Sequence, residues 1–368
     1  MRATSGLLLC SLLALAVGTS AARADAFLDQ AKATVKAATA KSGTWDGPTT
    51  GPAGMPGKSV VIVAGDLRNG GHTGVANGSV EAAKALGWTT RVIDGQGTVA
   101  GVTSAMSQAI ALKPDGIINA GFDLAQNMTS VEEADKQGIK MVAWHGGPTP
   151  GPVAGTPVFF NVTTDPDKVA EVSAMYAVAQ SDGKAGVVVF TDSAYAIAIK
   201  KSDGMAATIK KCAECKVLSV EDTPLADVAN RMPQLTTSLL QRYGDQWTYS
   251  LGINDLYYDF MGPSLTAAGK APEGPPMNIS GGDGSESAYQ RIRTGQYQVA
   301  TVPEPLTMQG WQLVDELNRA FAGEQPSGYF APVHLVVQDN IAFDGGDKNI
   351  YDPDNGYRDA YKKIWKVN

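Results

Sequence analysis

The sequence predicts an α/β protein made of two successive domains, each with a mainly parallel sheet. Short apolar segments alternate with amphipathic segments of about 10 to 15 residues, which is typical of parallel strands that helices cover on both faces. A Pro/Gly-rich stretch at 146–157 interrupts this alternation, which then restarts. The length of 368 residues also favours two hydrophobic cores over one.

The predicted elements follow one another in a regular order. An Ala-rich helical pattern covers 26–41, and a Gly/Pro-rich linker without periodicity covers 42–57. In the first domain, apolar runs predict strands, and the amphipathic runs between them predict helices. The strands are 59–65, 89–95, 115–121 and 139–147, and the helices are 74–87, 102–113 and 128–138. In the second domain the strands are 184–192, 216–222, 248–255, 276–284, 298–304 and 333–340, and the helices are 169–181, 196–211, 229–244, 258–270, 287–295 and 308–323. This alternation predicts successive βαβ units.

The first 24 residues have the order of a secretory signal peptide. A basic start precedes an apolar run at 7–17, and Ala22-Arg23-Ala24 follows as a small-residue cleavage site. The apolar run is too short to cross a bilayer. We expect cleavage after Ala24 and export to the periplasm. Cleavage removes two arginines and no acid, so the net charge of −7 becomes −9. This acidic balance disfavours nucleic acid or an anionic membrane surface as the partner.

Two cysteines remain after cleavage, Cys212 and Cys215. Export to an oxidising compartment favours a disulfide between them. A thioredoxin-like redox pair is the alternative, but such a pair opens a helix. Here the cysteines follow one predicted helix and precede a predicted strand, which favours a structural bridge.

Polar and aromatic side chains gather at the carboxyl ends of the predicted strands, where open α/β sheets bind their ligands. For any one of these residues the alternative is capping of the helix that begins there. Caps alone do not explain such residues at most strand ends of both domains. The candidate ligand-binding residues are Asp66, Arg68, Asn69, His72, Phe122, Asp123, Trp144, His145, Asn161, Tyr195, Asn254, Asp283 and Glu304.

No catalytic or cofactor motif accompanies these candidates. The three histidines are far apart in the sequence, and G-x-S-x-G, H-E-x-x-H and Walker motifs are absent. Segment 65–74 lacks the glycine spacing of a dinucleotide site. The sequence therefore predicts binding without a cofactor, a metal or a reaction. Carboxylates and amides suit adjacent hydroxyls, because hydrogen bonds to charged groups contribute roughly 1.5–3 kcal/mol each.

Residues 58–340 resemble the periplasmic sugar-binding proteins of ABC transporters, the type I or ribose-binding-like family. The resemblance lies in a strand ending in "IND" (253–255), a strand ending in "GGDG" (281–284), "TG" at 294–295 and "ATVPEP" at 300–305, with helices between them. Repressor relatives of the family begin with a DNA-binding helix-turn-helix, where this chain has the predicted signal peptide. The resemblance implies two Rossmann-like lobes, joined by three crossings of a hinge, that close around one ligand.

The resemblance also implies specific ligand contacts. Asn254, Asp283 and Asn69 match family contact positions, and Glu304 stands where the family usually has glutamine or a similar residue.

The chain departs from the family at other contact positions. Gly71 and His72 replace aromatic residues that often clamp the sugar, and His145 replaces an aspartate. Ile199 lies near the place of a family arginine. We therefore expect a ligand that is not held as ribose is. An aromatic side chain, that of Trp144, Phe122 or Tyr195, then covers the apolar face of the ligand. Polyols, amino sugars and other small polar molecules remain candidate ligands.

The function implied is that of a periplasmic solute-binding protein, a monomer that delivers a sugar or polyol to an inner-membrane permease. The expected division is a signal peptide (1–24), a helix and linker (25–57), a first lobe (58–162 and 304–332), a second lobe (163–303 and 333–345) and a C-terminal extension (346–368). Two alternatives remain. One is a sensory receptor whose closed form docks a chemoreceptor or kinase. The other is a secreted enzyme that acts on sugars through Asp283 and Glu304 as an acid pair.

Overall fold

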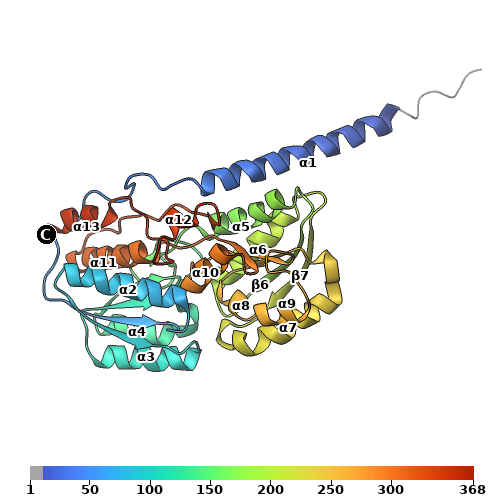
Figure 1. Ribbon diagram of the computed structural model, residues 1–368. Helices are drawn as coiled ribbons and strands as arrows, with labels where there is room; N and C mark the ends of the chain where they lie inside the picture. Colours follow the sequence, from blue (N-terminus) through green and yellow to red (C-terminus); the bar gives the residue numbers. More distant parts are fainter. Residues whose placement is uncertain (1–10) are drawn as a thin grey trace, which may run out of the picture.

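Two α/β lobes lie side by side in the computed structural model, which describes residues 11–368 and their side chains from residue 24 onward (Figure 1). The first lobe contains a five-stranded sheet in the order β2-β1-β3-β4-β5, with every pair of strands parallel. Its strands are β1 (Ser59–Ala64), β2 (Thr89–Asp94), β3 (Gly116–Ala120), β4 (Lys140–Trp144) and β5 (Asn161–Val162). β3 is buried along its whole length, because helices cover both faces of the sheet.

The helices of the first lobe form two separate apolar layers on this sheet. One layer contains α2 (Gly70–Ala85), α11 (Leu306–Ala322) and α13 (Tyr357–Trp365), and the other contains α3 (Val99–Ala111) and α4 (Met128–Lys136). A short 3-10 helix, η1 (Ala125–Asn127), precedes α4. The two layers confirm the predicted parallel sheet with helices on both faces.

The second lobe contains a six-stranded sheet in the order β11-β10-β9-β8-β6-β7. Its strands are β6 (Gly186–Thr191), β7 (Lys216–Asp222), β8 (Tyr249–Gly252), β9 (Met277–Ser280), β10 (Gln298–Thr301) and β11 (Val336–Val337). Only the pairing of β11 with β10 is antiparallel. Its helices are α5 (Pro166–Gln180), α6 (Ala196–Ile209), α7 (Val228–Tyr243), α8 (Leu256–Asp259), α9 (Gly262–Ala267), α10 (Glu286–Thr294) and α12 (Ile341–Asp344), with the 3-10 helices η2 (Leu225–Asp227) and η3 (Gly244–Gln246). The α/β class with two lobes is therefore confirmed.

The chain crosses between the lobes three times, at 163–165, 302–305 and 323–335. The last crossing leads into β11, which is much shorter than the strand expected at 333–340. The chain turns immediately after β11, because the Val337 N–H donates to Asn340 Oδ1 at 2.8 Å and the Asn340 N–H donates to the Val337 carbonyl. Of the eight residues expected in this strand, only Val336 and Val337 therefore pair with the sheet, at its edge.

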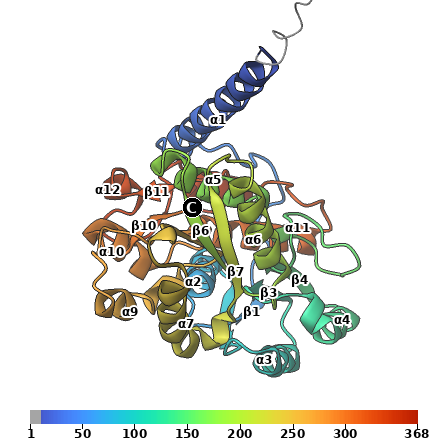
Figure 2. The same cartoon turned by 90° about the vertical axis from the view of Figure 1, so that its right-hand side faces the viewer.

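The N-terminal helix and the C-terminal tail pack on different lobes. Helix α1 (Ser11–Ala38) projects away from the body of the molecule, and its last turns lie along α5 of the second lobe (Figures 1 and 2). The helix expected at 26–41 belongs to it, and residues 1–10 of the predicted signal peptide lie outside the described residues. Within the described part of the chain, no helix combines the length and the apolar character that a membrane span requires.

The linker and tail cover the outer face of α11. Trp45 of the linker contacts the ring of Tyr361 in α13, with centroids 5.2 Å apart. Trp365 stacks on Trp311 of α11 at 5.4 Å, and its indole N–H donates to Asp315 Oδ1 at 2.7 Å. The tail is therefore part of the core of the first lobe.

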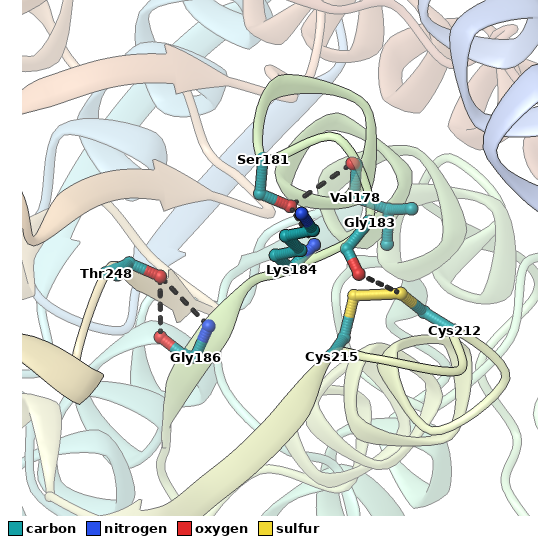
Figure 3. The surroundings of a disulfide bond; sticks show 8 residues. All are labelled: Val178, Ser181, Gly183, Lys184, Gly186, Cys212, Cys215 and Thr248. Atoms are coloured by element: carbon teal, nitrogen blue, oxygen red, sulfur yellow. Dashed lines mark hydrogen bonds between the residues drawn. A yellow bond between two sulfur atoms is a disulfide. The ribbon is translucent and has the colours of Figure 1, made fainter.

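A disulfide joins Cys212 and Cys215 in the turn between α6 and β7 (Figure 3). The pair follows one helix and precedes a strand, as the sequence order indicated. Cys212 Sγ lies 3.2 Å from the carbonyl oxygen of Gly183. This approach is a packing contact, because a bridged sulfur carries no hydrogen to donate.

Candidate functional site

A small cavity lined by both polar and apolar side chains lies between the lobes, at the carboxyl ends of the strands. Its volume is about 30 Å³, which is room for one or two water molecules. Residues of both lobes line it: His72, Gly121 and His145 from the first, and Tyr195, Ile197, Ala198, Lys201, Leu225, Ile253, Asn254 and Asp283 from the second. A larger surface groove, about 490 Å³, runs between α1 and the second lobe, but none of the sequence-predicted candidates lines it. Of the thirteen candidates, five line the small cavity, whereas a second opening between the lobes, of about 390 Å³, is lined by Arg68 and Asn254 among them.

Asp283 and Asn254 form a buried hydrogen-bonded pair on the second-lobe side of this cavity. The amide of Asn254 donates to Asp283 Oδ2 at 2.7 Å, and its oxygen accepts from the Leu256 N–H at 2.9 Å. The side chain of Asn254 is thereby held in one orientation. Asp283 Oδ1, by contrast, can accept from a ligand.

The opposite side of the cavity is formed by the first turn of α2. Asn69 caps this helix by accepting from the Gly71 N–H at 2.9 Å. A Cβ atom on Gly71 would lie 2.3 Å from Asp283 Oδ2. Glycine is therefore needed at position 71 for the two lobes to approach this closely. The family asparagine at position 69 acts here as a helix cap.

His72 presents an N–H group to the cavity as a neutral ring. The backbone N–H of Asp66 donates to His72 Nδ1 at 2.9 Å, so the hydrogen of the neutral imidazole is on Nε2. Burial disfavours the charged ring and, against the nearby acid Asp283, lowers the pKa of His72 to about 4. His72 is therefore a hydrogen-bond donor through Nε2 at neutral pH.

Glu304 lies behind His145 and is saturated by donors from the hinge region. It accepts from the Thr164 N–H at 3.1 Å, the Thr164 hydroxyl at 2.8 Å and His145 Nε2 at 3.1 Å. The amide of Gln309 is a fourth donor. Burial opposes ionisation, but the hydrogen bond and charge of His145, with the charge of Lys201, outweigh it and lower the pKa of Glu304 to about 2.

Glu304 consequently joins three parts of the hinge region. Thr164 belongs to the first crossing, Glu304 to the second, and Gln309 to the first turns of α11. Glu304 does not line the cavity. Its contact with the ligand stays a prediction, and the geometry favours a role in holding the hinge and orienting His145.

Trp144 also supports His145 from behind. Its side chain is fully buried, and its indole N–H donates to Gln309 Oε1 at 2.7 Å. The His145 ring stacks on it, with centroids 3.7 Å apart and planes 12° apart. His145 itself has a φ of +54°, a left-handed conformation that turns its ring back over Trp144 and toward Glu304. Trp144 is therefore not free to cover the apolar face of a ligand, as the sequence had suggested.

The remaining candidates lie outside the cavity lining, each for a local reason. Phe122 is buried in the α3–α4 layer of the core. The amide of Asn161 is used by the loop that follows β4, because it accepts from the Gly146 N–H and donates to the carbonyls of Gly147 and Thr149. Asp66 pairs with the largely exposed Arg68 at 2.8 Å.

Asp123 joins the two lobes instead of lining the cavity. Its Oδ1 accepts from the Ala125 N–H at 2.9 Å, and its Oδ2 accepts from the Ala196 N–H of the second lobe at 3.1 Å. The amide of Gln126 also donates to the carbonyl of Ala194 across the gap. Of the thirteen candidates, the cavity brings together His72, His145, Tyr195, Asn254 and Asp283.

The cavity also contains a cation that the sequence prediction missed. Lys201 of α6 is 2% exposed and lines the cavity. It lies four residues after Ile197 and three after Ala198, which are lining residues on the same helix. Residues at these spacings share one helix face. The shared face of α6 therefore indicates Lys201, whereas the family resemblance pointed only to Ile199, two positions earlier.

Tyr195, which caps the start of α6, is the half-buried aromatic residue of the cavity. Burial, followed by the charge of Asp192, raises the pKa of its phenol well above its usual range. The hydroxyl is therefore a neutral donor and acceptor at any physiological pH.

Comparison with known proteins agrees with this architecture. The model of the family described as periplasmic binding protein domain matches residues 60–325. Among curated proteins, none matches the chain. A glucose-galactose binding protein from Geobacillus stearothermophilus aligns with a TM-score of 0.68 at 18% identity, over 78% of this chain and 99% of that chain.

Two solute-binding proteins from Agrobacterium vitis are similarly related in structure. The one bound to α-D-tagatopyranose aligns with a TM-score of 0.71 at 16% identity, over 80% of this chain and 99% of that chain. The one with bound allitol aligns with a TM-score of 0.65 at 18% identity, over 77% and 97%. Identities this low show a shared fold alone, whereas the family model matches well over half of this chain. The chain therefore belongs to the periplasmic binding protein family, with the two-lobed fold of its type I sugar-binding members.

Proposed function

We propose that this protein is the exported solute-binding component of an ABC transporter. It takes a small hydroxylated ligand between its lobes and presents the closed form to a membrane permease. The observation that carries the proposal is the cavity itself. It collects unsatisfied donors and acceptors from both lobes, namely His72 Nε2, the Tyr195 hydroxyl and Asp283 Oδ1, at the strand ends where α/β sheets bind ligands.

Ligand entry requires the lobes to separate. A cavity of about 30 Å³ is smaller than any sugar, and Asp123 and Gln126 hold its rim closed. Closure over a ligand then engages groups of both lobes at once and excludes water, which strengthens each polar contact. A dissociation constant near 1 μM corresponds to about −8 kcal/mol, which a few charge-assisted hydrogen bonds can supply beyond the cost of closing.

Binding fits this site better than catalysis does. An acid pair that cleaves glycosidic bonds needs one carboxyl group with a raised pKa as the proton donor. Glu304 is not that proton donor, because its pKa is lowered to about 2. It is not placed to act as the ionised partner either, because four donors occupy it and it does not line the cavity. We therefore infer that the ligand leaves the protein chemically unchanged.

Calorimetric titration tests the proposal. The panel comprises sugars and polyols named for solved relatives, such as galactose, tagatose and allitol, together with their acidic and amino derivatives. We expect saturable 1:1 binding of at least one compound and full recovery of that compound by chromatography after several hours. The absence of binding across the whole panel, or the appearance of a product, would contradict the proposal.

A further inference from the structure

The ammonium group of Lys201 is the one buried cation of the cavity. Lys201 lies in the second turn of α6 and is 2% exposed. Its Nζ is close to the backbone before Asp283, because a Cβ atom on Gly282 would lie 3.0 Å from it. Among the residues whose side chains the structure describes, none forms a hydrogen bond or an ion pair with this ammonium. The ammonium is therefore available to a group that enters the cavity between the lobes.

The acids around Lys201 are occupied by other donors. Glu304 accepts four hydrogen bonds, as described above. Asp283 is the acidic residue that lines the cavity, and one of its oxygens is engaged by Asn254. A buried charge without a direct partner is costly, so the site favours a ligand that brings one.

We propose that Lys201 binds a carboxylate group of the ligand, so that the ligand is a small polyhydroxy acid such as an aldonate or a uronate. This inference rests on the proposed function and names the ligand class. One ammonium matches the single charge of a carboxylate, whereas a phosphate dianion would need a second cation, and no other lysine or arginine lines the cavity. His72 Nε2 and the Tyr195 hydroxyl then serve the remaining acceptors of the ligand.

The hydroxyl groups of such a ligand have their own partner. Asp283 Oδ1 is an acceptor on the same side of the cavity as Lys201. The acid and the cation therefore bind different groups of the ligand. Asp283 accepts hydrogen bonds from its hydroxyl groups, and Lys201 donates to its carboxylate. The alternative is that Lys201 only balances the charge of Glu304, which it influences electrostatically. The two roles differ in what removal of the ammonium does to ligand preference.

Matched pairs of ligands separate these roles. Titration calorimetry compares galacturonate with galactose, glucuronate with glucose, and gluconate with glucitol, on the wild type, Lys201→Met and Lys201→Arg. Lys200→Met is the control, because the neighbouring lysine points to the surface and pairs with Asp167 at 3.0 Å. The wild type should bind at least one acid about ten- to a hundredfold tighter than its neutral partner. Lys201→Met should abolish that preference, and Lys201→Arg and Lys200→Met should keep it.

Each result decides the inference. Equal or tighter binding of the neutral partners by the wild type would overturn the carboxylate assignment and leave the proposed function standing. An acid preference that survives Lys201→Met would overturn the role of Lys201. Failure of every compound, acidic and neutral, to bind the folded wild type would overturn the proposed function and this inference together. Thermal melting of each variant verifies that the fold is intact under the conditions of the titration.

Discussion

At the scale of single residues, the two cavity histidines have different tasks. The backbone N–H of Asp66 sets the tautomer of His72 and makes its Nε2–H a permanent donor. His145 instead uses its Nε2 on Glu304 and stacks on Trp144. The first histidine is available to a ligand through a single N–H, whereas the side chain of the second is held by two neighbouring residues. A binding site needs both kinds of residue, since donors are useful only when a supporting shell fixes their direction.

Asp283 provides the first prediction. Asp283→Ala should weaken ligand binding by roughly 1.5–3 kcal/mol, or about ten- to a hundredfold or more, because it removes the acceptor at the cavity wall. Asp283→Asn keeps the shape and one acceptor and should lose less. Titration calorimetry measures both, with thermal melting as the control for folding. Unchanged affinity together with a lower melting temperature would mean that Asp283 only stabilises the loop after β9.

Glu304 gives a prediction on pH. Its folded pKa is about 2, below the usual 4.5, so its ionised form favours the folded state. This stabilisation is present above about pH 4.5 and is lost as the pH falls toward 2. Wild type should exceed Glu304→Gln in unfolding free energy by on the order of 3 kcal/mol at pH 7. Urea denaturation at pH 7, 4 and 3 should show this difference shrinking, and a constant difference would refute the assignment.

At the scale of elements, strand ends were the most informative feature of the sequence. Continuous apolar runs such as 59–65 identified the parallel strands, and the rule for open α/β sheets placed the site at their carboxyl ends. That rule led to the edge of each sheet at which the cavity lies and to five of the residues that line it. It could not say which way a side chain turns. Trp144 faces inward because Gln309, 165 residues away in the sequence, accepts its N–H, and no local pattern contains that information.

Short edge elements and terminal segments were the least predictable. The expected strand at 333–340 ends at Val337 because Asn340 closes a turn. The tail carried no periodic signal that related it to α11, yet Trp365 stacks on Trp311 and donates to the buried Asp315. Such contacts depend on which lobe the tail reaches, and tertiary structure decides that.

The turn between α6 and β7 carries the prediction on the disulfide. A bridge that closes so short a loop should stabilise at the low end of the usual ~0–5 kcal/mol range. The double variant Cys212→Ser, Cys215→Ser should therefore melt only slightly below the wild type and bind ligand equally well. Mass spectrometry of unreduced exported protein should find no alkylatable thiol at these positions. Two free thiols would contradict the structural role.

At the scale of the whole molecule, few contacts join the cavity-bearing faces of the lobes. Asp123 and Gln126 of the first lobe bond to the backbone at the start of α6, and the first turn of α2 meets Asp283. Asp123 also holds the N–H of Ala125 at the start of η1. These contacts are polar and accessible to water once the lobes part. Under the proposed function, these contacts break each time the lobes part to release a ligand.

Gly71 allows closure to be separated from folding. An alanine Cβ at this position would lie 2.3 Å from Asp283 Oδ2 and 2.6 Å from Asp283 Cβ, so Gly71→Ala is incompatible with the closed arrangement. Within the first lobe the same change should be harmless or stabilising by roughly 0.5–1 kcal/mol, because alanine favours a helix more than glycine does. We therefore expect a melting temperature at or above that of the wild type, with affinity reduced more than tenfold.

X-ray scattering should show that ligand compacts the wild type but not Gly71→Ala. Asn77→Ala, on the exposed side of the same helix, is the control and should behave as the wild type. Ligand-induced compaction of Gly71→Ala with normal affinity would show that α2 does not meet Asp283 when the lobes close.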